Sequence, residues 1–205
     1  MKKKNLFATL LLAASSISAA GTLSIFDRQW TVPVDADWQI DREDGAAVLH
    51  LAKARDSLPG PRRPIQFALT EVPHYSRLTV EADVKPLGKS LIIVFAYQDS
   101  AHFNYAHLSI DGGKLVPVHN GIFHVYGGER VRISDPDSPP AFPQNNHWYH
   151  ATLTHDAITG AVAVAVDGKP VATLRAMDVS LGPGKVGLGS FDETAEFKNV
   201  KIVTQ

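Results

Sequence analysis

The chain of 205 residues contains no cysteine, and this absence excludes disulfide bonds as a source of stability. Hydrophobic residues make up 44% of the sequence, which is enough for a substantial core. Stability therefore has to come from that core, with a bound metal ion as a further source that the sequence leaves open. The length fits one domain.

The chain also lacks an excess of charge of either sign. Its formal net charge is −1, and beyond the first four residues Lys and Arg do not gather into a basic stripe. Proteins that bind nucleic acid or anionic membrane surfaces carry clustered Lys and Arg side chains. We therefore expect no nucleic-acid partner and no membrane-bound mature chain.

Several catalytic motifs are missing. The sequence has no H-x-H and no H-E-x-x-H, which are common ligand patterns of zinc sites. It has no E-x-D-x-x-E run, which places three acids on one strand face in family-16 glycosidases, and no G-x-S-x-G nucleophile motif. No catalytic residue is therefore identified by motif.

Long apolar runs are absent except at residues 6–17, which follow three lysines at positions 2–4. This run is too short to cross a bilayer comfortably, and residues 18–20 are the small residues that a signal peptidase requires. The pattern predicts a signal peptide at residues 1–20, cleaved after Ala20. We expect an exported bacterial protein, periplasmic or secreted, whose domain spans residues 21–205.

Beyond residue 21, apolar and polar residues alternate. The alternation is clear at residues 76–85, whereas residues 91–97 are apolar on both faces, as in a central strand. Further short strands are predicted at residues 102–110, 115–118 and 121–126. Short strands broken by Gly and Pro indicate an all-β sandwich of two antiparallel sheets. Its predicted core includes Leu78, Val80, Val94, Leu153, Val164 and Leu188.

Two segments break this rhythm. Residues 53–64 are rich in Pro and Arg, and residues 134–146 contain four prolines without periodicity. Both segments are predicted to be long surface loops, and loops of this length are often functional.

Residues 146–203 carry a resemblance to a known fold group. Trp148 opens an alternating strand, Asp167-Gly168 is a strong hairpin signal, and residues 184–189 read Gly-x-Val-Gly-x-Gly. This order resembles the laminin-G-like and concanavalin-A-like group, the lectin–glucanase superfamily. The resemblance implies a jelly-roll sandwich. It also implies a carbohydrate ligand, because the group is mostly sugar-binding or sugar-cleaving.

A more distant resemblance involves both ends of the domain. The spacing Trp38-x-Ile40 and Leu49-x-Leu51, together with FKNVKI at residues 197–202, is similar to the 3-keto-disaccharide hydrolase-like family. That family's N-S-G-[IV]-x-[FW]-R and G-[YF]-E-x-Q strands are replaced here by other sequences. The activity of that family is therefore not carried over.

Nine histidines are a high number for this length, and strand parity sorts some of them by face. Tyr105 and His107 fall on the more polar face of their strand. In the following strand, Phe123 and Val125 are predicted to face the core, which leaves His124 on an open face. Curved sandwiches of this kind bind sugars on the concave face. The predicted carbohydrate-binding residues are Tyr97, Tyr105, His107, Asn120, His124 and Arg132.

The resemblance also implies calcium. Sandwiches of this group often bind it where their terminal strands meet, through carboxylates and backbone carbonyls. Asp192 lies just before the last strand, and Asp27 lies near the first. These two residues are therefore the predicted calcium ligands.

Three functions follow from these observations. The favoured one is a non-catalytic module that binds a polysaccharide or oligosaccharide. The second is a His/Tyr-dependent glycan-cleaving enzyme, a glycoside hydrolase or polysaccharide lyase, in which Tyr105, His107 and Arg132 would act on a uronate. The third is a protein–protein adhesion domain, because laminin-G-like sandwiches also have that role.

Overall fold

The computed structural model describes residues 19–205 except residues 57–59, 61 and 138. The predicted signal peptide lies outside the described residues, apart from Ala19 and Ala20. The first strand, β1, begins at Gly21, directly after the predicted cleavage site. Within the described part of the chain, no helix has the length and apolar character needed to span a bilayer.

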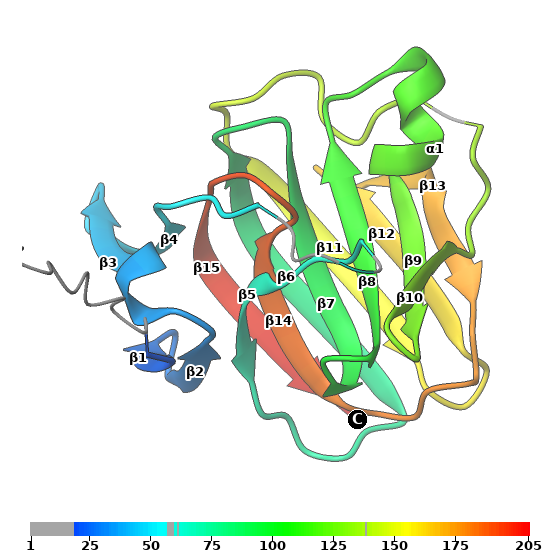
Figure 1. Ribbon diagram of the computed structural model, residues 1–205, viewed down its shortest axis with the longest axis horizontal. Helices are drawn as coiled ribbons and strands as arrows, with labels where there is room; N and C mark the ends of the chain where they lie inside the picture. Colours follow the sequence, from blue (N-terminus) through cyan, green and yellow to red (C-terminus); the bar gives the residue numbers. More distant parts are fainter. Residues whose placement is uncertain (1–18, 57–59, 61, 138) are drawn as a thin grey trace, which may run out of the picture.

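The described strands form two antiparallel sheets that pack face to face (Figure 1). The eight-stranded sheet contains, in spatial order, β1 (Gly21–Ile25), β2 (Arg28–Val32), β5 (Gln66–Thr70), β14 (Lys185–Ser190), β7 (Ser90–Asp99), β8 (His102–Ser109), β9 (Gly121–Tyr126) and β10 (Glu129–Arg132). The seven-stranded sheet contains β13 (Lys169–Met177), β12 (Ala161–Val166), β11 (Tyr149–Asp156), β6 (Arg77–Pro86), β15 (Ala195–Thr204), β4 (Ala46–Leu51) and β3 (Trp38–Glu43). The predicted all-β jelly-roll sandwich is confirmed.

The main core lies between the two sheets. The alternation predicted for residues 76–85 is confirmed in β6, where every second side chain from Leu78 to Val84 is fully buried. All six residues predicted for the core are buried. Val94 differs from the other five, because it packs in a separate cluster.

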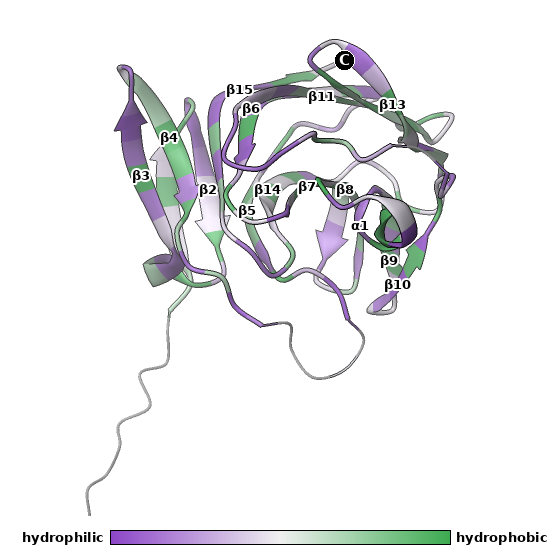
Figure 2. Ribbon diagram, turned by 90° about the horizontal axis from the view of Figure 1, so that it is seen from above, coloured by the Kyte–Doolittle hydropathy of each residue, from purple (hydrophilic) through white to green (hydrophobic). Residues whose placement is uncertain are grey.

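This second cluster covers the outer face of the eight-stranded sheet, the face directed away from the seven-stranded sheet. We call it the outer-face cluster; it consists of Phe67, Ile92, Val94, Phe103, Tyr105, Phe123, Val125 and Phe191. Figure 2 shows the sheet nearly edge-on, curving around this face, with α1 (Val116–His119) on the same side. The middle strands of this sheet are therefore apolar on both faces.

The strand predicted at residues 115–118 is wrong. The short helices η2 (Gly113–Leu115) and α1 occupy this segment. Gly113 has a φ of +56°, which favours glycine, and Pro117 lies in the first turn of α1, where its missing N–H costs nothing. A third short helix, η1 (Asp35–Asp37), precedes β3.

The described residues of both predicted loops form neither helix nor strand, as expected. Each loop is nevertheless anchored by a buried contact. Phe142 is fully buried and stacks on Tyr149, with ring centroids 4.7 Å apart. In the other loop, the guanidinium of Arg55 pairs with the buried carboxylate of Asp37.

Candidate functional site

Tyr105 and His107 lie on the same face of β8, as strand parity predicts, but this face is not an open polar surface. Tyr105 is fully buried and stacks on Phe123, with ring centroids 5.2 Å apart. His107 is 2% exposed and stacks on Phe191 at 5.8 Å. Both side chains therefore belong to a packed aromatic layer on the outer face of the eight-stranded sheet.

The prediction of which side chains of β9 face the core is wrong. Tyr105 pairs with Phe123 across the two strands, and Asn104 pairs with His124. Phe123 and Val125 thus share the outer face with Tyr105, and His124 points the other way. The prediction failed because both faces of this sheet bury apolar side chains, so an apolar set does not identify the face toward the other sheet.

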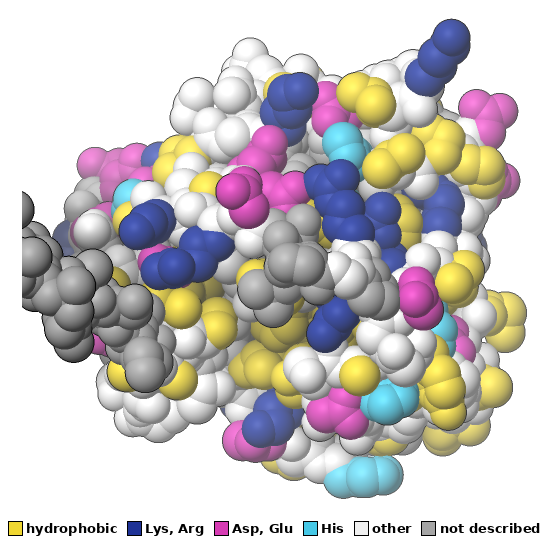
Figure 3. Space-filling view, viewed as in Figure 1, with side chains coloured by type: hydrophobic (Ala, Val, Ile, Leu, Met, Phe, Trp, Pro, Cys, Tyr) yellow, Lys and Arg dark blue, Asp and Glu magenta, His cyan; other side chains and the backbone are white. Residues whose placement is uncertain are grey.

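A hollow of about 230 Å³ opens on the outer face beside His107. We call it the His107 hollow. It is lined by Arg62, Lys89, Ser90, His107, Asp111, Val118, His119, Arg130, Phe191, Asp192 and Glu193. These residues come from the loop before β5, the start of β7, β8, the segment leading into α1, α1 itself, β10 and the loop after β14. Lys and Arg side chains gather over this face, with acidic side chains beside them (Figure 3).

The hollow is bordered by polar atoms that have no hydrogen-bond partner. Among the described residues, six buried side-chain nitrogen or oxygen atoms lack a partner. Three of them lie at this hollow, namely both ring nitrogens of His107 and Oδ1 of Asp192. A buried polar group without a partner costs about 1–3 kcal/mol, and a ligand or an ordered water that hydrogen-bonds to these atoms would remove this cost.

Two arginines lie over the ring of Phe191, which lines the hollow. The guanidinium carbons of Arg62 and Arg130 are each 5.0 Å from the ring centroid of Phe191. Arg130 also lies 4.9 Å from the ring centroid of Phe123 and donates a hydrogen bond of 3.3 Å to the Tyr105 hydroxyl. The aromatic layer therefore fixes the position of these cations.

A histidine–carboxylate pair forms another side of the hollow. Nδ1 of His119, at the end of α1, lies 2.5 Å from Oδ2 of Asp111. The His119 ring centroid is 5.6 Å from that of His107. A carboxylate at Nδ1 orients an imidazole and leaves its other nitrogen for a ligand or a proton transfer.

Asn120 and Arg132 were predicted to bind carbohydrate, but the structure uses their polar groups internally. Asn120 is fully buried; its Oδ1 accepts from the backbone N–H groups of Ser109 and Ala141. Arg132 donates to the backbone carbonyls of residues 116, 117, 134 and 135, which fastens α1 to β10. Neither side chain lines the His107 hollow.

His124 lies outside the hollow as well. Its Nδ1 is 2.7 Å from Oδ1 of Asn104 and 3.0 Å from Oδ2 of Asp178, and its ring stacks on that of Tyr126. The prediction that His124 shares one surface with Tyr105 and His107 is therefore wrong.

Tyr97 does reach the outer face, through an irregularity in β7. Ala96 has a φ of +51°, and the pairing of β7 with β8 shifts register at this point. Tyr97 consequently packs edge-to-face on Phe67, at 5.8 Å. Together with Phe67 it lines a second, more apolar hollow of about 400 Å³, which shares no lining residue with the His107 hollow.

Within the part of the chain that the structure describes, neither predicted calcium ligand, Asp192 or Asp27, belongs to a cluster of three metal-ligating side chains. Oδ2 of Asp192 is 2.5 Å from the Arg62 guanidinium, and Asp27 lies in the turn between β1 and β2. Calcium binding by these residues stays a prediction. Asp192 lines the same hollow as His107.

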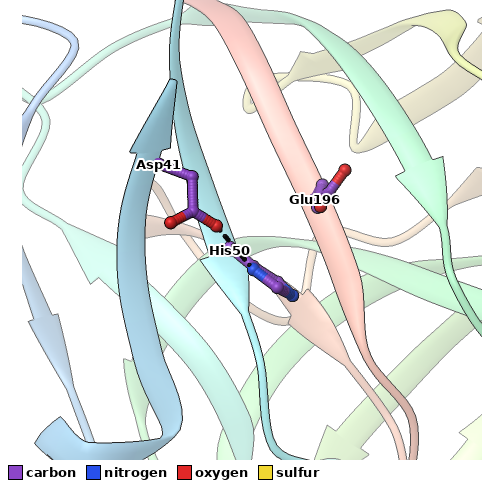
Figure 4. A group of neighbouring side chains, drawn as sticks. All are labelled: Asp41, His50 and Glu196. Atoms are coloured by element: carbon purple, nitrogen blue, oxygen red, sulfur yellow. Dashed lines mark hydrogen bonds and ion pairs between the residues drawn. The ribbon is translucent and has the colours of Figure 1, made fainter. Parts of the chain in front are cut away.

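Among the described residues, one group has metal-ligand geometry. Asp41, His50 and Glu196 extend from β3, β4 and β15, and their ligand atoms lie within 4.8 Å of one another (Figure 4). Nδ1 of His50 is 2.8 Å from Asp41 Oδ2, and Glu196 forms an ion pair with Lys85. Because each side chain already has a partner, we regard this group as part of a surface ion-pair network.

Several hollow residues were not predicted as site residues. Arg62 belongs to the loop at residues 53–64, whose length and composition are signals of function. His119 was visible only as one of several clustered histidines. Arg130 was considered from the sequence only as an alternative to Arg132, and it is Arg130 that lines the hollow. Asp111 and Phe191 gave no signal, because only tertiary packing brings them to His107.

Acid should destabilise the fold through His107. Burial, followed by the electrostatic effect of His119 and of the Arg130 guanidinium, holds the pKa of His107 well below its ordinary value. The unfolded chain takes up a proton at this residue near about pH 6.5, whereas the folded protein does not. The stability contribution is therefore complete above about pH 6.5 and is lost as the pH falls from there towards the folded pKa.

We expect this one site to remove about 2 kcal/mol of unfolding free energy between about pH 7 and pH 5. Urea denaturation at the two pH values measures the change. In His107→Phe the same acidification is expected to cost about 2 kcal/mol less. An identical pH dependence in the two proteins would contradict the assignment.

Comparison with known proteins finds similar folds but no matching family. No protein-family model and no curated protein matches the chain. A solved structure of the carbohydrate-binding module CBM66 from Bacillus subtilis matches with a TM-score of 0.58 and 19% identity, over 85% of this chain and 95% of that one. A putative glycosyl hydrolase from Parabacteroides distasonis matches with a TM-score of 0.53 and 16% identity, over 83% and 91%. Both are similar to this chain in fold.

Proposed function

We propose that the protein is an exported carbohydrate-binding module that holds a polysaccharide or oligosaccharide at the His107 hollow. The observation that carries the proposal is the group of unpartnered buried atoms there, the two ring nitrogens of His107 and Oδ1 of Asp192. A neutral imidazole offers one donor and one acceptor, and a carboxylate oxygen accepts. Adjacent sugar hydroxyls supply both complementary roles.

The surroundings of these atoms support the same ligand class. Phe191 gives the hollow an apolar wall, while Arg62 and Arg130 supply donors fixed against its ring. Small-molecule sites typically combine apolar walls with a few placed polar groups. The similarity in fold to a carbohydrate-binding module agrees with this proposal.

A glycan array with the purified protein, in millimolar calcium and again with EDTA, tests the proposal and the calcium prediction together. Binding of one glycan class in both conditions supports the site without calcium. Binding that disappears in EDTA supports calcium as well. An array without any bound glycan would contradict the proposed function.

His107→Phe gives the sharper test. The new ring keeps the stacking on Phe191 but removes both unpartnered nitrogens, so we expect equal or higher stability at neutral pH. Affinity for the array's best glycan is expected to fall about 10-fold or more, because a ligand hydroxyl then lacks its partner. Isothermal titration calorimetry measures the affinity, and thermal melting measures the stability.

The matched control is His74→Phe, since His74 is exposed and lies away from the hollow. This control is expected to bind like the wild type. Unchanged binding by His107→Phe would place the ligand elsewhere on the molecule.

One observation favours glycan cleavage as a second candidate function. The His119–Asp111 pair orients an imidazole inside the hollow, which is the arrangement of a general acid or base. A reducing-end assay on each glycan that binds discriminates the two functions. Release of new reducing ends supports an enzyme, and binding without release supports the module.

A further inference from the structure

We infer that the saccharide bound at the His107 hollow carries an anionic group, a carboxylate or a sulfate ester, and that Arg130 pairs with this group. The inference rests on the proposed function and names the substrate class of the same site. It follows from the way in which the charges around the hollow are already paired.

The acidic side chains of the hollow have partners within the protein. Oε2 of Glu193 accepts hydrogen bonds from the backbone N–H groups of Lys89 and Ser90, at 2.7 and 2.6 Å. Oδ2 of Asp111 pairs with His119, and Oδ2 of Asp192 pairs with Arg62, both at 2.5 Å. Three carboxylates that line the hollow are thus occupied by donors that the fold supplies.

Arg130 has no such partner among the described residues. In the described part of the chain, its guanidinium donates one hydrogen bond, to the neutral hydroxyl of Tyr105. A guanidinium carries five N–H donors, so most of them are available to a ligand. Its position against the rings of Phe123 and Phe191 holds the group in place. A fixed planar guanidinium suits a carboxylate or sulfate, with which it forms paired hydrogen bonds.

The neighbouring charges bias the floor of the hollow toward an anion. Besides burial and His119, the charges that lower the pKa of His107 are those of three arginines: Arg130, Arg62 and Arg132. Arg132 donates to backbone carbonyls, and the nearby carboxylate of Asp135 opposes its charge. Arg130, for which no carboxylate partner is found among the described residues, therefore adds positive potential where the aromatic layer lowers the local dielectric.

The unpartnered Oδ1 of Asp192 does not contradict an anionic ligand. This oxygen needs a donor, which a ring hydroxyl provides, whereas Arg130 needs an acceptor. An acidic sugar carries both kinds of group on one ring. A neutral sugar would satisfy Asp192 and leave Arg130 without a counter-ion.

Matched pairs of oligosaccharides test the inference by calorimetry at low ionic strength. One pair is an oligogalacturonate and its methyl ester; the other is a chondroitin sulfate oligosaccharide and its desulfated form. We expect one of the charged forms to bind at least 10-fold more tightly than its matched form of lower charge, and its affinity to fall as salt is added. The pair that shows the preference identifies the group as carboxylate or sulfate.

Substitution of Arg130 assigns the preference to a residue. In Arg130→Gln the affinity for the charged form is expected to fall 10- to 100-fold, while the form of lower charge keeps its affinity. Arg130→Lys keeps the charge but loses the planar pair of N–H donors, so we expect an intermediate loss of affinity. Arg175→Gln is the control, because Arg175 is exposed on β13 of the other sheet. Thermal melting verifies that each variant folds.

Failure of the inference and failure of the proposed function give different results. Equal affinity within each pair would overturn the inference and leave carbohydrate binding intact. Binding of no saccharide at all would overturn the proposed function, and the inference with it. A preference that persists in both Arg130 variants would show that another residue pairs with the anion, which overturns the assignment.

Discussion

Replacing Tyr105 by alanine is expected to lower the free energy of unfolding by about 3–5 kcal/mol, the usual cost of deleting a buried aromatic ring. Tyr105 is fully buried at the centre of the outer-face cluster. Its ring stacks on Phe123 at 5.2 Å and lies 6.1 Å from Phe103. Alanine would leave a cavity beneath Arg130, between strands that pair on both sides. Urea denaturation measures the loss.

Tyr105→Phe is the matched control for this prediction. It keeps the ring and removes the hydroxyl that accepts from Arg130, so we expect a loss of about 1 kcal/mol or less. A Tyr105→Ala variant as stable as Tyr105→Phe would show that the outer-face cluster does not support the fold. Weak sugar binding by Tyr105→Ala is consequently no test of the site, because the variant alters the floor on which the site rests.

Local signals predicted the framework of this fold well. The Asp167-Gly168 turn has positive φ angles of 49° and 74°, as the hairpin signal requires, and the strands on either side of it form β12 and β13. The alternation in residues 76–85 fixed which side of β6 faces the core. Such features depend on residues close together in the chain, so the sequence states them directly.

The arrangement of the site could not be predicted in the same way. Parity correctly placed Tyr105 and His107 on one face, but it could not show that this face is itself buried. In β9 the apolar residues Phe123 and Val125 belong to the outer face, so the usual assumption that apolar means core-facing gave the wrong side. Two apolar faces make the parity of a strand ambiguous.

The chemistry of the hollow depends on contacts between distant segments. Arg62 meets Asp192 across 130 positions, and Glu193 accepts from Lys89 and Ser90 across more than 100. No spacing rule connects such residues. What the sequence did provide was their residue types and their loops, which is why Asp192 was selected for its charge.

Gly189→Ala is expected to destabilise the domain by about 3 kcal/mol or more, because the new side chain would meet backbone rather than a movable group. A β-carbon at this position would lie 2.6 Å from Cα of Phe67 and closer still to the carbonyl oxygen of Gln66. Both atoms belong to β5, which pairs with β14 through Gly189 and Phe67. Relief of the clash therefore requires these strands to separate.

Gly182→Ala is the control, because a β-carbon there meets no atom within 4 Å and we expect little change in stability. Thermal and urea denaturation of the two variants measure the difference, and equal stabilities would contradict the prediction.

The Gly189→Ala substitution is also expected to disturb the site, because Phe191 and Asp192 follow β14 directly and line the His107 hollow. A shift of β14 moves an aromatic wall and an unpartnered acceptor together. Any Gly189→Ala protein that still folds is therefore expected to bind its glycan more weakly than Gly182→Ala.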